Sequence, residues 1–156
     1  MGEQADTDDL AAIVGLLHRY CELQDAADFP GVAELFRHAT YAVRGGASHH
    51  GYDEVLALKA HHDQVHEDGT LRTKHVTTNT IVEWDGDVAT TRSYFTVFQS
   101  TAGLPLQAVI GGRYHDTFER VDGGWRFRER LIIGDLIGDL THHLRDNPLG
   151  SMRADQ

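Results

Sequence analysis

The second half of the chain is a succession of four long segments whose residues favour β-strands. They are rich in Thr, Val, Ile and aromatic residues, the types that pack well on a pleated sheet. The segments are Arg72–Trp84, Val88–Gln99, Leu106–Arg120 and Trp125–Asp135. The connectors are Asp85-Gly86, a longer loop with Gly103 and Pro105, and Asp122-Gly123-Gly124. Because Asp-Gly between such segments is a strong hairpin signal, the pattern predicts consecutive, mainly antiparallel strands.

The first half of the chain has helical periodicity instead. Apolar residues at helical spacing predict a first helix over about Asp8–Ala27. Pro30 suits the first turn of a second, short helix, and a third helix is predicted over about Tyr52–His66, after a short strand at Thr40–Arg44. Helices first and long strands afterwards indicate an α+β fold, with the helices on one face of a curved sheet.

The composition is typical of a single globular domain. The chain has 156 residues with a formal net charge of -10, so we expect one domain over residues 1–156, with a core at about 8–144 and a flexible C-terminal tail. The negative charge argues against nucleic acid as a partner, although Arg126, Arg128 and Arg130 alternate along one predicted strand. No apolar run approaches the roughly 20 residues that span a bilayer, and the N-terminus lacks the apolar segment of a signal peptide. We therefore expect a cytoplasmic protein with no membrane contact.

A carboxylate lies on the core-facing stripe of the first predicted helix. At about 100° per residue, Tyr20, Leu17, Cys21 and Asp25 fall within one arc, with Tyr20 at one edge and Asp25 at the other. Burial of an unpaired carboxylate is costly, so Asp25 requires an explanation. It either pairs with a buried group, caps the short helix at Pro30, or faces water at a frayed helix end.

A histidine lies early in the first long strand. Because side chains alternate along a strand, His75, Thr77, Asn79 and Ile81 should share one face. This arrangement would place a base beside the hydrogen-bonding group of Asn79. The alternative is a half-buried histidine with a purely structural role.

Together these features resemble the SnoaL-like group of the nuclear-transport-factor-two-like superfamily. The resemblance spans about residues 9–144 and rests on four features. These are an acidic residue that ends helix one, the strand histidine, Gly111-Gly112-Arg113-Tyr114-His115-Asp116, and Gly124-Trp125-Arg126-Phe127. It implies a cone-shaped α+β barrel, with about three N-terminal helices closing a strongly bent sheet. It also implies a homodimer or homotrimer that uses the outer face of the sheet.

The resemblance implies a set of site residues as well. In dehydratase-like members an Asp near the end of helix one orients a His on the sheet, and Asp25 and His75 match those positions. Tyr20, Tyr41 and Arg130 match substrate-facing residues of individual members. We add Asn79, Tyr94 and Phe98 as substrate-binding candidates. Phe98 lies where some members carry a second ionisable residue, so the dehydratase set is incomplete here.

These residue types can support chemistry that needs no cofactor. His75 would remove a proton next to a carbonyl group, held in orientation by Asp25. Tyr20 or Asn79 would donate to the oxygen on which charge develops, and Arg130 would stabilise a leaving group or an anionic substrate. We therefore expect a lyase or isomerase, of dehydratase type, that acts on a small hydrophobic or aromatic cyclic substrate.

Two alternatives remain open at this stage. A polyketide-type cyclase or an epoxide-opening enzyme would need a further acid or water-holding group, for which Tyr94, Tyr114, Asp116 and Glu129 are loose candidates. A non-catalytic domain that binds a small ligand is possible on the same fold. A hydrogen bond between Asp25 and His75 inside a closed pocket would favour an enzyme.

The chain is rich in histidine, which raises the question of a metal site. His62 and His66 are one helical turn apart, a spacing that can hold zinc, with His61 and Asp63 adjacent. Without a third ligand we interpret them as a solvated helix face and expect no metal. For the pair His142-His143 we likewise expect surface exposure, although one of them would touch substrate if the C-terminal segment covers the pocket.

Overall fold

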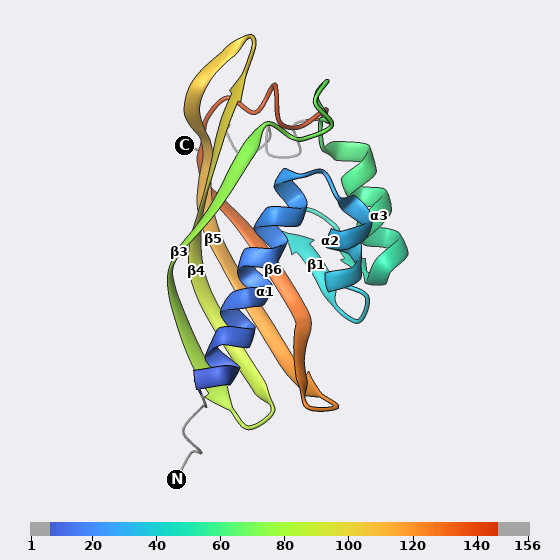
Figure 1. The fold of residues 1–156 in the computed structure, drawn as a ribbon, viewed down its shortest axis with the longest axis vertical. Helices are drawn as coiled ribbons and strands as arrows, with labels where there is room; N and C mark the ends of the chain where they lie inside the picture. The colour runs from blue at the N-terminus through green and yellow to red at the C-terminus, as the bar shows by residue number, and fades with distance from the viewer. Residues whose placement is uncertain (1–6, 147–156) are drawn as a thin grey trace.

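The computed structural model describes residues 7–146, and in it three helices lie on the concave side of a bent sheet (Figure 1). The elements along the chain are α1 (Thr7–Asp25), α2 (Phe29–Leu35), β1 (Thr40–Val43), β2 (Ser48–His50), α3 (Gly51–His62), β3 (Thr73–Asp85), β4 (Val88–Thr101), β5 (Leu104–Val121) and β6 (Gly124–Ile137). The strand order is β2-β1-β6-β5-β4-β3. Only β1 and β6 pair in parallel among the described strands. The predicted α+β fold is confirmed.

The helices form where the apolar periodicity predicts them. Helix α1 buries Ile13, Leu17 and Tyr20 against the sheet. Helix α2 has Asp28 as its N-cap, whose carboxylate accepts a hydrogen bond from the amide of Gly31. Since Asp28 performs this role, Asp25 is not the cap of the Pro30 helix. No described helix has the length and apolar character needed to cross a membrane.

Several predicted boundaries differ from the structure. Helix α3 ends at His62, four residues before the predicted end, because the next residues bond to the C-terminal segment instead of continuing the helix: Asp63 bridges to Leu144 and the Gln64 amide donates to a carbonyl there. The three-residue strand β2 was not predicted. The longer loop expected between the second and third long strands is only a two-residue turn. The predicted flexible tail lies largely outside the described residues.

The sheet bends where glycine replaces a side chain. At Gly112 of β5, a Cβ would lie 2.0 Å from the carbonyl oxygen of Ile133 and 2.8 Å from the Phe95 ring. The register between β5 and β6 shifts at the same point. Glycine is the residue that permits such close approach. A side chain at position 112 would therefore displace β6 or the Phe95 ring, which lines the cavity.

Two β-bulges change which side chains face inward. In β3 the register shifts between Thr78 and Ile81, and Asn79 adopts a positive φ of 42°. A bulge reverses the alternation beyond it, so Asn79 and Ile81 are exposed and do not share the face of His75. In β6 the register shifts beside Arg128, and this turns Arg130 inward. The prediction that Asn79 shares a face with His75 was wrong because it assumed an unbroken strand.

The inward position of Arg130 places an ion pair, between Arg130 and Asp116, in the core. Arg130 donates two hydrogen bonds to Asp116, at 2.8 and 2.9 Å, and neither side chain has any exposure. The Arg130 guanidinium also lies over the rings of Tyr114, at 3.8 Å, and Tyr20, at 4.3 Å. Bidentate geometry and aromatic stacking are how proteins stabilise a buried guanidinium.

A C-terminal segment, residues 138–146, crosses the open end of the bent sheet. Gln64 donates to the carbonyls of Thr141 and Leu144, and Gln99 donates to the carbonyl of His142. His66 also bonds to the His142 carbonyl, at 2.8 Å. These contacts hold the segment over the sheet, so the expected cover of the pocket is present.

We predict that removing one partner of the buried ion pair destabilises the fold strongly. Asp116→Ala leaves the Arg130 cation buried without its carboxylate, and should lower the free energy of unfolding by about 3–5 kcal/mol. Urea denaturation measures this. The double variant Asp116→Leu/Arg130→Met should recover much of the loss, because it removes both charges. Glu34→Ala, which breaks the exposed pair with Arg37, should have little effect. A similar small effect for Asp116→Ala would contradict the prediction.

Candidate active site

Asp25 and His75 form a direct hydrogen-bonded pair where α1 meets β3. His75 Nδ1 lies 2.5 Å from Asp25 Oδ1, and the His75 amide donates to Oδ2 at 3.0 Å. The Thr73 hydroxyl donates to Oδ1 at 2.7 Å. The side chain of Asp25 is only 12% exposed and that of His75 only 6%. Thr73 and His75, two successive inward-facing residues of β3, therefore hold the Asp25 carboxylate at the end of α1 with three hydrogen-bond donors.

The charge of the Asp25 carboxyl group determines which nitrogen of the His75 ring carries a proton. Burial alone would raise the pKa of Asp25, but the hydrogen bonds from the His75 ring, the Thr73 hydroxyl and the His75 amide hold this pKa below its ordinary value. An ionised carboxylate accepts hydrogen bonds and cannot donate. Nδ1 of His75 must therefore carry a proton, which leaves Nε2 as the ring nitrogen that can exchange a proton with a ligand.

His75 forms part of the wall of an interior cavity of about 330 Å³. Apolar and aromatic side chains line most of the cavity and come from the sheet, α3 and the C-terminal segment: Val43, Leu58, Phe95, Val97, Ile110, Tyr114, Ile132, Leu140 and Leu144. Asp25 does not line it but lies behind His75. A mostly apolar cavity with a few polar groups is the usual form of a small-molecule site.

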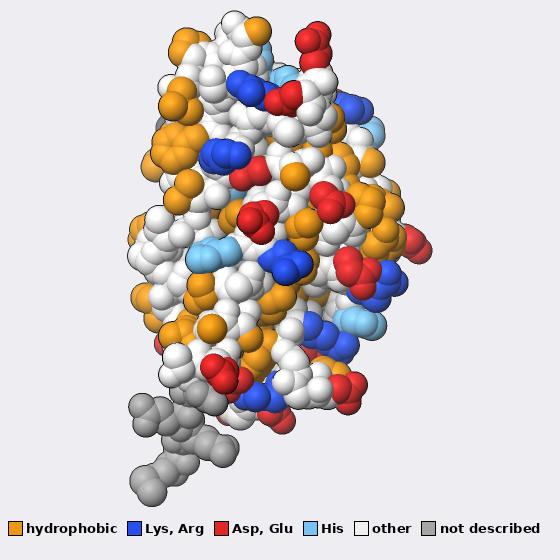
Figure 2. Space-filling view, in the orientation of Figure 1, with side chains coloured by type: hydrophobic (Ala, Val, Ile, Leu, Met, Phe, Trp, Pro, Cys, Tyr) orange, Lys and Arg blue, Asp and Glu red, His pale blue; other side chains and the backbone are white. Residues whose placement is uncertain are grey.

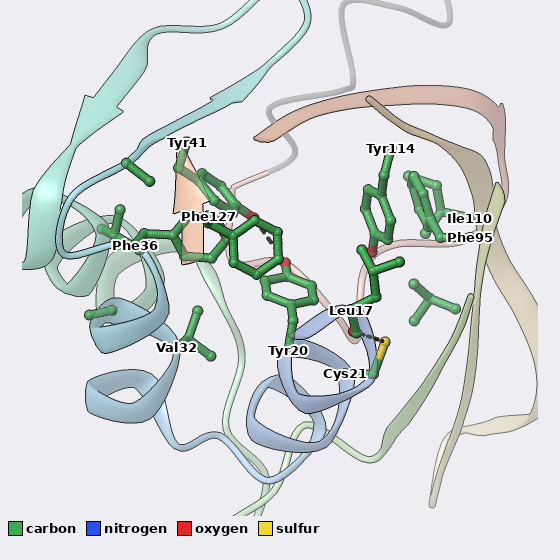
Figure 3. Close-up of a cluster of buried hydrophobic side chains, with 14 of the residues drawn as sticks. Leu17, Tyr20, Cys21, Val32, Phe36, Tyr41, Phe95, Ile110, Tyr114 and Phe127 are labelled. Carbon is green, nitrogen blue, oxygen red and sulfur yellow. Dashed lines mark hydrogen bonds between the residues drawn. The ribbon is translucent and has the colours of Figure 1, made fainter. Parts of the chain in front are cut away.

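A second set of polar groups also lines the cavity. The hydroxyls of Tyr20 on α1 and Tyr41 on β1 lie 3.0 Å apart and point toward each other (Figure 3). Lys59 of α3 donates to Tyr41 at 2.8 Å and to Tyr20 at 3.3 Å. Asp63 lies 3.8 Å from the Lys59 ammonium and accepts a 2.8 Å bond from Gln24. Tyr20 and Tyr41 thus line the cavity as the sequence led us to expect.

Sequence reasoning missed Lys59, Asp63 and Gln24. All three are buried and line the cavity. A signal was present for two of them, because Val55, Lys59 and Asp63 recur every four residues and so share one helix face with a core valine. A lysine on such a face indicates a buried cation, but its partners lie on α1 and β1, far away in the sequence.

His143 was expected at the surface and is instead only 6% exposed, in the cavity wall. Its ring contacts the His75 ring edge-on, with the centroids 5.8 Å apart. Burial, and secondarily the nearby His75, lower the pKa of His143 to about 4. His143 is therefore neutral at physiological pH. The segment that carries it lacks helical or strand periodicity, which is why the pattern gave no indication of its burial.

Four predicted substrate contacts lie elsewhere. Asn79 is exposed at the β3 bulge, and Tyr94 and Phe98 are 56% and 38% exposed on the outer face of the sheet. Arg130 is buried behind Tyr20 and Tyr114 and does not line the cavity. The strand period already places Tyr94 and Phe98 outward, because Phe95 and Val97 face inward. The expected homodimer or homotrimer on this outer face stays a prediction.

The further groups considered for a cyclase or epoxide-opening site are also not assembled. Tyr114 lines the cavity, but Asp116 is paired with Arg130 and Glu129 is exposed.

Acidic and basic side chains are interspersed over the face of the molecule that carries the helices (Figure 2).

The structure rearranges the histidines that were considered for a metal. His66 bonds to the carbonyl of His142 and does not join His62. Within residues 7–146, His61, His62 and Asp146 bring ligand atoms within 4.8 Å of one another, and these could hold an ion. His61 and Asp146 are largely exposed, whereas His62 lines the same cavity as His75.

We predict that His143 makes stability depend on pH between about 6.5 and 4. An unfolded histidine binds a proton near pH 6.5, whereas His143 in the folded protein binds one only near pH 4. The unfolded state therefore holds more protons in this window, and stability falls as the pH falls, by at most about 1.4 kcal/mol per pH unit. Urea unfolding at pH 7, 6 and 5 should give a shallower decline for His143→Phe than for the native protein. The exposed variant His18→Gln should follow the native curve. Parallel curves for all three proteins would contradict a buried neutral His143.

Comparison with known proteins identifies the family. The family model of the SnoaL-like domain matches residues 5–131. No curated protein matches the chain.

Among solved structures, a Mycobacterium tuberculosis protein of unknown function, determined as an Asp-to-Asn variant, is 28% identical, with a TM-score of 0.71, 87% of this chain covered and 79% of the other. An NTF2-like protein with a cystatin-like fold from Novosphingobium aromaticivorans is 25% identical, with a TM-score of 0.67 and 99% of both chains covered. A proposed scytalone dehydratase from the same organism is 20% identical, with a TM-score of 0.68, 85% of this chain covered and 87% of the other. Because the family model matches most of the length of the chain and the fold agrees, the chain belongs to the SnoaL-like family.

Proposed function

We propose that the protein is a cofactor-independent lyase or isomerase, of dehydratase type, in which His75 takes a proton from a cyclic substrate. One observation carries the proposal: His75 is hydrogen-bonded through Nδ1 to Asp25 and forms part of the wall of a mostly apolar pocket. This is the arrangement of a general base whose orientation and tautomer are held by a carboxylate.

The reaction begins with transfer of a C–H proton to Nε2 of His75. The C–H electron pair moves toward an adjacent carbonyl group, whose oxygen gains negative charge. Asp25 stabilises the imidazolium that forms, because its carboxylate lies 2.5 Å from Nδ1. The neutral His143 beside the ring adds no second positive charge that would oppose this protonation.

The same intermediate leads to either class of product. In an elimination, the electron pair returns from the oxygen, a C=C bond forms, the C–O bond to a hydroxyl breaks, and the departing oxygen takes the proton from His75 and leaves as water. In an isomerisation, His75 returns the proton to a different carbon. Both routes regenerate neutral His75, so the pair alone supports both.

The cavity and the family support this class of chemistry. A volume of about 330 Å³ lies at the lower end of the range for small-molecule sites, which favours a compact cyclic substrate. A structural neighbour is a proposed scytalone dehydratase, which favours dehydration. A non-catalytic binding domain has no need of a base held by three hydrogen bonds to one carboxylate.

We predict that the native protein exchanges acidic C–H hydrogens of cyclic ketones with solvent. Every route above begins with removal of this proton, so exchange in D₂O detects the base before the product is known. Proton NMR on a panel of one- and two-ring ketones and hydroxyketones should show loss of the α-hydrogen signal. His75→Ala should slow the exchange by about 10²–10⁴-fold, the usual contribution of a positioned base.

Two further variants make this test specific. Asp25→Asn should also slow the exchange, because an amide does not hold the ring in the same tautomer. His18→Ala, on the exposed face of α1, should leave it unchanged. Exchange that is equally fast in the native protein and in His75→Ala would exclude His75 as the base. Binding of the ketones without any exchange would favour a binding domain instead.

A further inference from the structure

Lys59 is an unexpected residue in the wall of a mostly apolar cavity. Its side chain is only 8% exposed, and the chain has just one other lysine, Lys74, which is exposed on β3. Burial alone would lower the pKa of Lys59, but the oxygens of Tyr20, Tyr41 and Asp63 around the ammonium hold it above its ordinary value. The Asp63 carboxylate lies 3.8 Å from the Lys59 ammonium, so the cavity wall contains a paired cation. A purely apolar lining would be cheaper, since burial of a charge is costly even when it is paired.

The closest partners of this cation are hydroxyl oxygens. Tyr41 lies 2.8 Å from the ammonium and Tyr20 lies 3.3 Å from it. The Asp63 carboxylate is farther away, at 3.8 Å, and already accepts a 2.8 Å bond from Gln24. The ammonium therefore acts mainly on the two tyrosine hydroxyls.

A count of hydrogen atoms shows that one donor is unused. The two hydroxyls share one hydrogen bond, which occupies one of their two hydrogens. Lys59 donates to both oxygens and cannot accept. Within residues 7–146 no other acceptor bonds to either hydroxyl. Tyr20 and Tyr41 both line the cavity, so the remaining hydrogen is available to a ligand.

The environment makes this hydrogen a strong donor that stays in place. Burial raises the pKa of Tyr20 well above its ordinary value, although Lys59 opposes the rise, so the phenol is protonated at neutral pH. The neighbouring ammonium polarises the O–H bond, and electrostatic effects are larger between buried side chains such as these than in water. Such a donor gains strength when the oxygen it contacts becomes negative.

The donor and the base act on the same small volume. The rings of Tyr20 and His75 are 6.4 Å apart, centroid to centroid, and both line the cavity. A carbonyl oxygen at the tyrosine hydroxyls and the C–H bond on a carbon next to that carbonyl can therefore lie within one small molecule. When His75 removes the proton, the negative charge develops on the oxygen that faces Lys59.

We propose that Lys59, Tyr20 and Tyr41 form an oxyanion site, and that the substrates are enolisable cyclic ketones that bind as neutral molecules and become enolates. This inference rests on the proposed function, because it names the substrate class of the same cavity. Lys59 is the specificity-determining residue: it favours a ligand whose oxygen carries negative charge over one whose oxygen is neutral.

Phenolates test the site without turnover, because they resemble a cyclic enolate in shape and charge. The probe is 4-nitrophenol, whose anion absorbs visible light, so that binding and ionisation are read together by titration. The native protein should lower the apparent pKa of the bound phenol. Lys59→Met should weaken phenolate binding by about 10- to 100-fold, as expected for loss of a charge-assisted contact. Lys74→Met, which removes the same charge from the surface, should bind like the native protein.

A second variant of the site and two control ligands complete the experiment. Tyr41→Phe, a variant of nearly unchanged shape, should also weaken phenolate binding, and this tests the site even if Lys59→Met does not fold. Cyclohexanol should bind weakly in every variant. Equal phenolate affinity in the native protein, Lys59→Met and Tyr41→Phe would overturn the proposal, as would benzoate binding as tightly as the phenolate, which would indicate a site for permanent carboxylates. Phenolate binding by the native protein reports the oxyanion site and hydrogen exchange reports the base, so a failure of the base and a failure of the oxyanion site are distinguishable.

Discussion

The carboxylate of Asp25 joins the fold to the chemistry. It accepts hydrogen bonds from the Thr73 hydroxyl and from the amide and ring of His75, and the Asp25 carbonyl accepts one from the amide of Leu71. The end of α1 is thereby fixed to the first residues of β3. The contacts that dock the helix on the sheet also set the position and tautomer of the imidazole. The buried carboxylate that the helical wheel left unexplained is therefore satisfied by the proposed base itself.

The aromatic residues of the cavity are positioned by a charge that lies behind them. Arg130 does not line the cavity, but its guanidinium lies over the rings of Tyr20 and Tyr114, which do. Its ion pair with Asp116 fixes it in place. Tyr114 in turn stacks on Phe95, with centroids 4.5 Å apart. Arg130 was expected to meet substrate directly, and the structure instead gives it a role in holding Tyr20.

Regular periodicity made most of the fold predictable, and its interruptions account for the errors. The four long strands and α1 follow from patterns of period two and 3.6, and the pairing of Asp25 with His75 agrees with the expectation from the helix stripe and the family resemblance. A β-bulge depends on the neighbouring strand, so the sequence alone could not place Asn79 outward, away from the face of His75. His143 lies in an irregular segment whose burial depends on contacts with Gln64 and Gln99. Lys59 was missed because its partners come from two other elements.

The distribution of charge in the cavity suits a substrate that changes charge during the reaction. Lys59 is protonated, and His143 is held neutral by burial. His75 gains a positive charge only when it accepts a proton, at which point Asp25 balances it. If the substrate oxygen becomes negative in the same step, new charges of opposite sign appear together, one beside Asp25 and the other beside Lys59, and each of these groups is already oriented to meet it. Because these groups are fixed by the fold, they need little reorganisation at the moment of proton transfer, which is the condition under which electrostatic stabilisation is most effective.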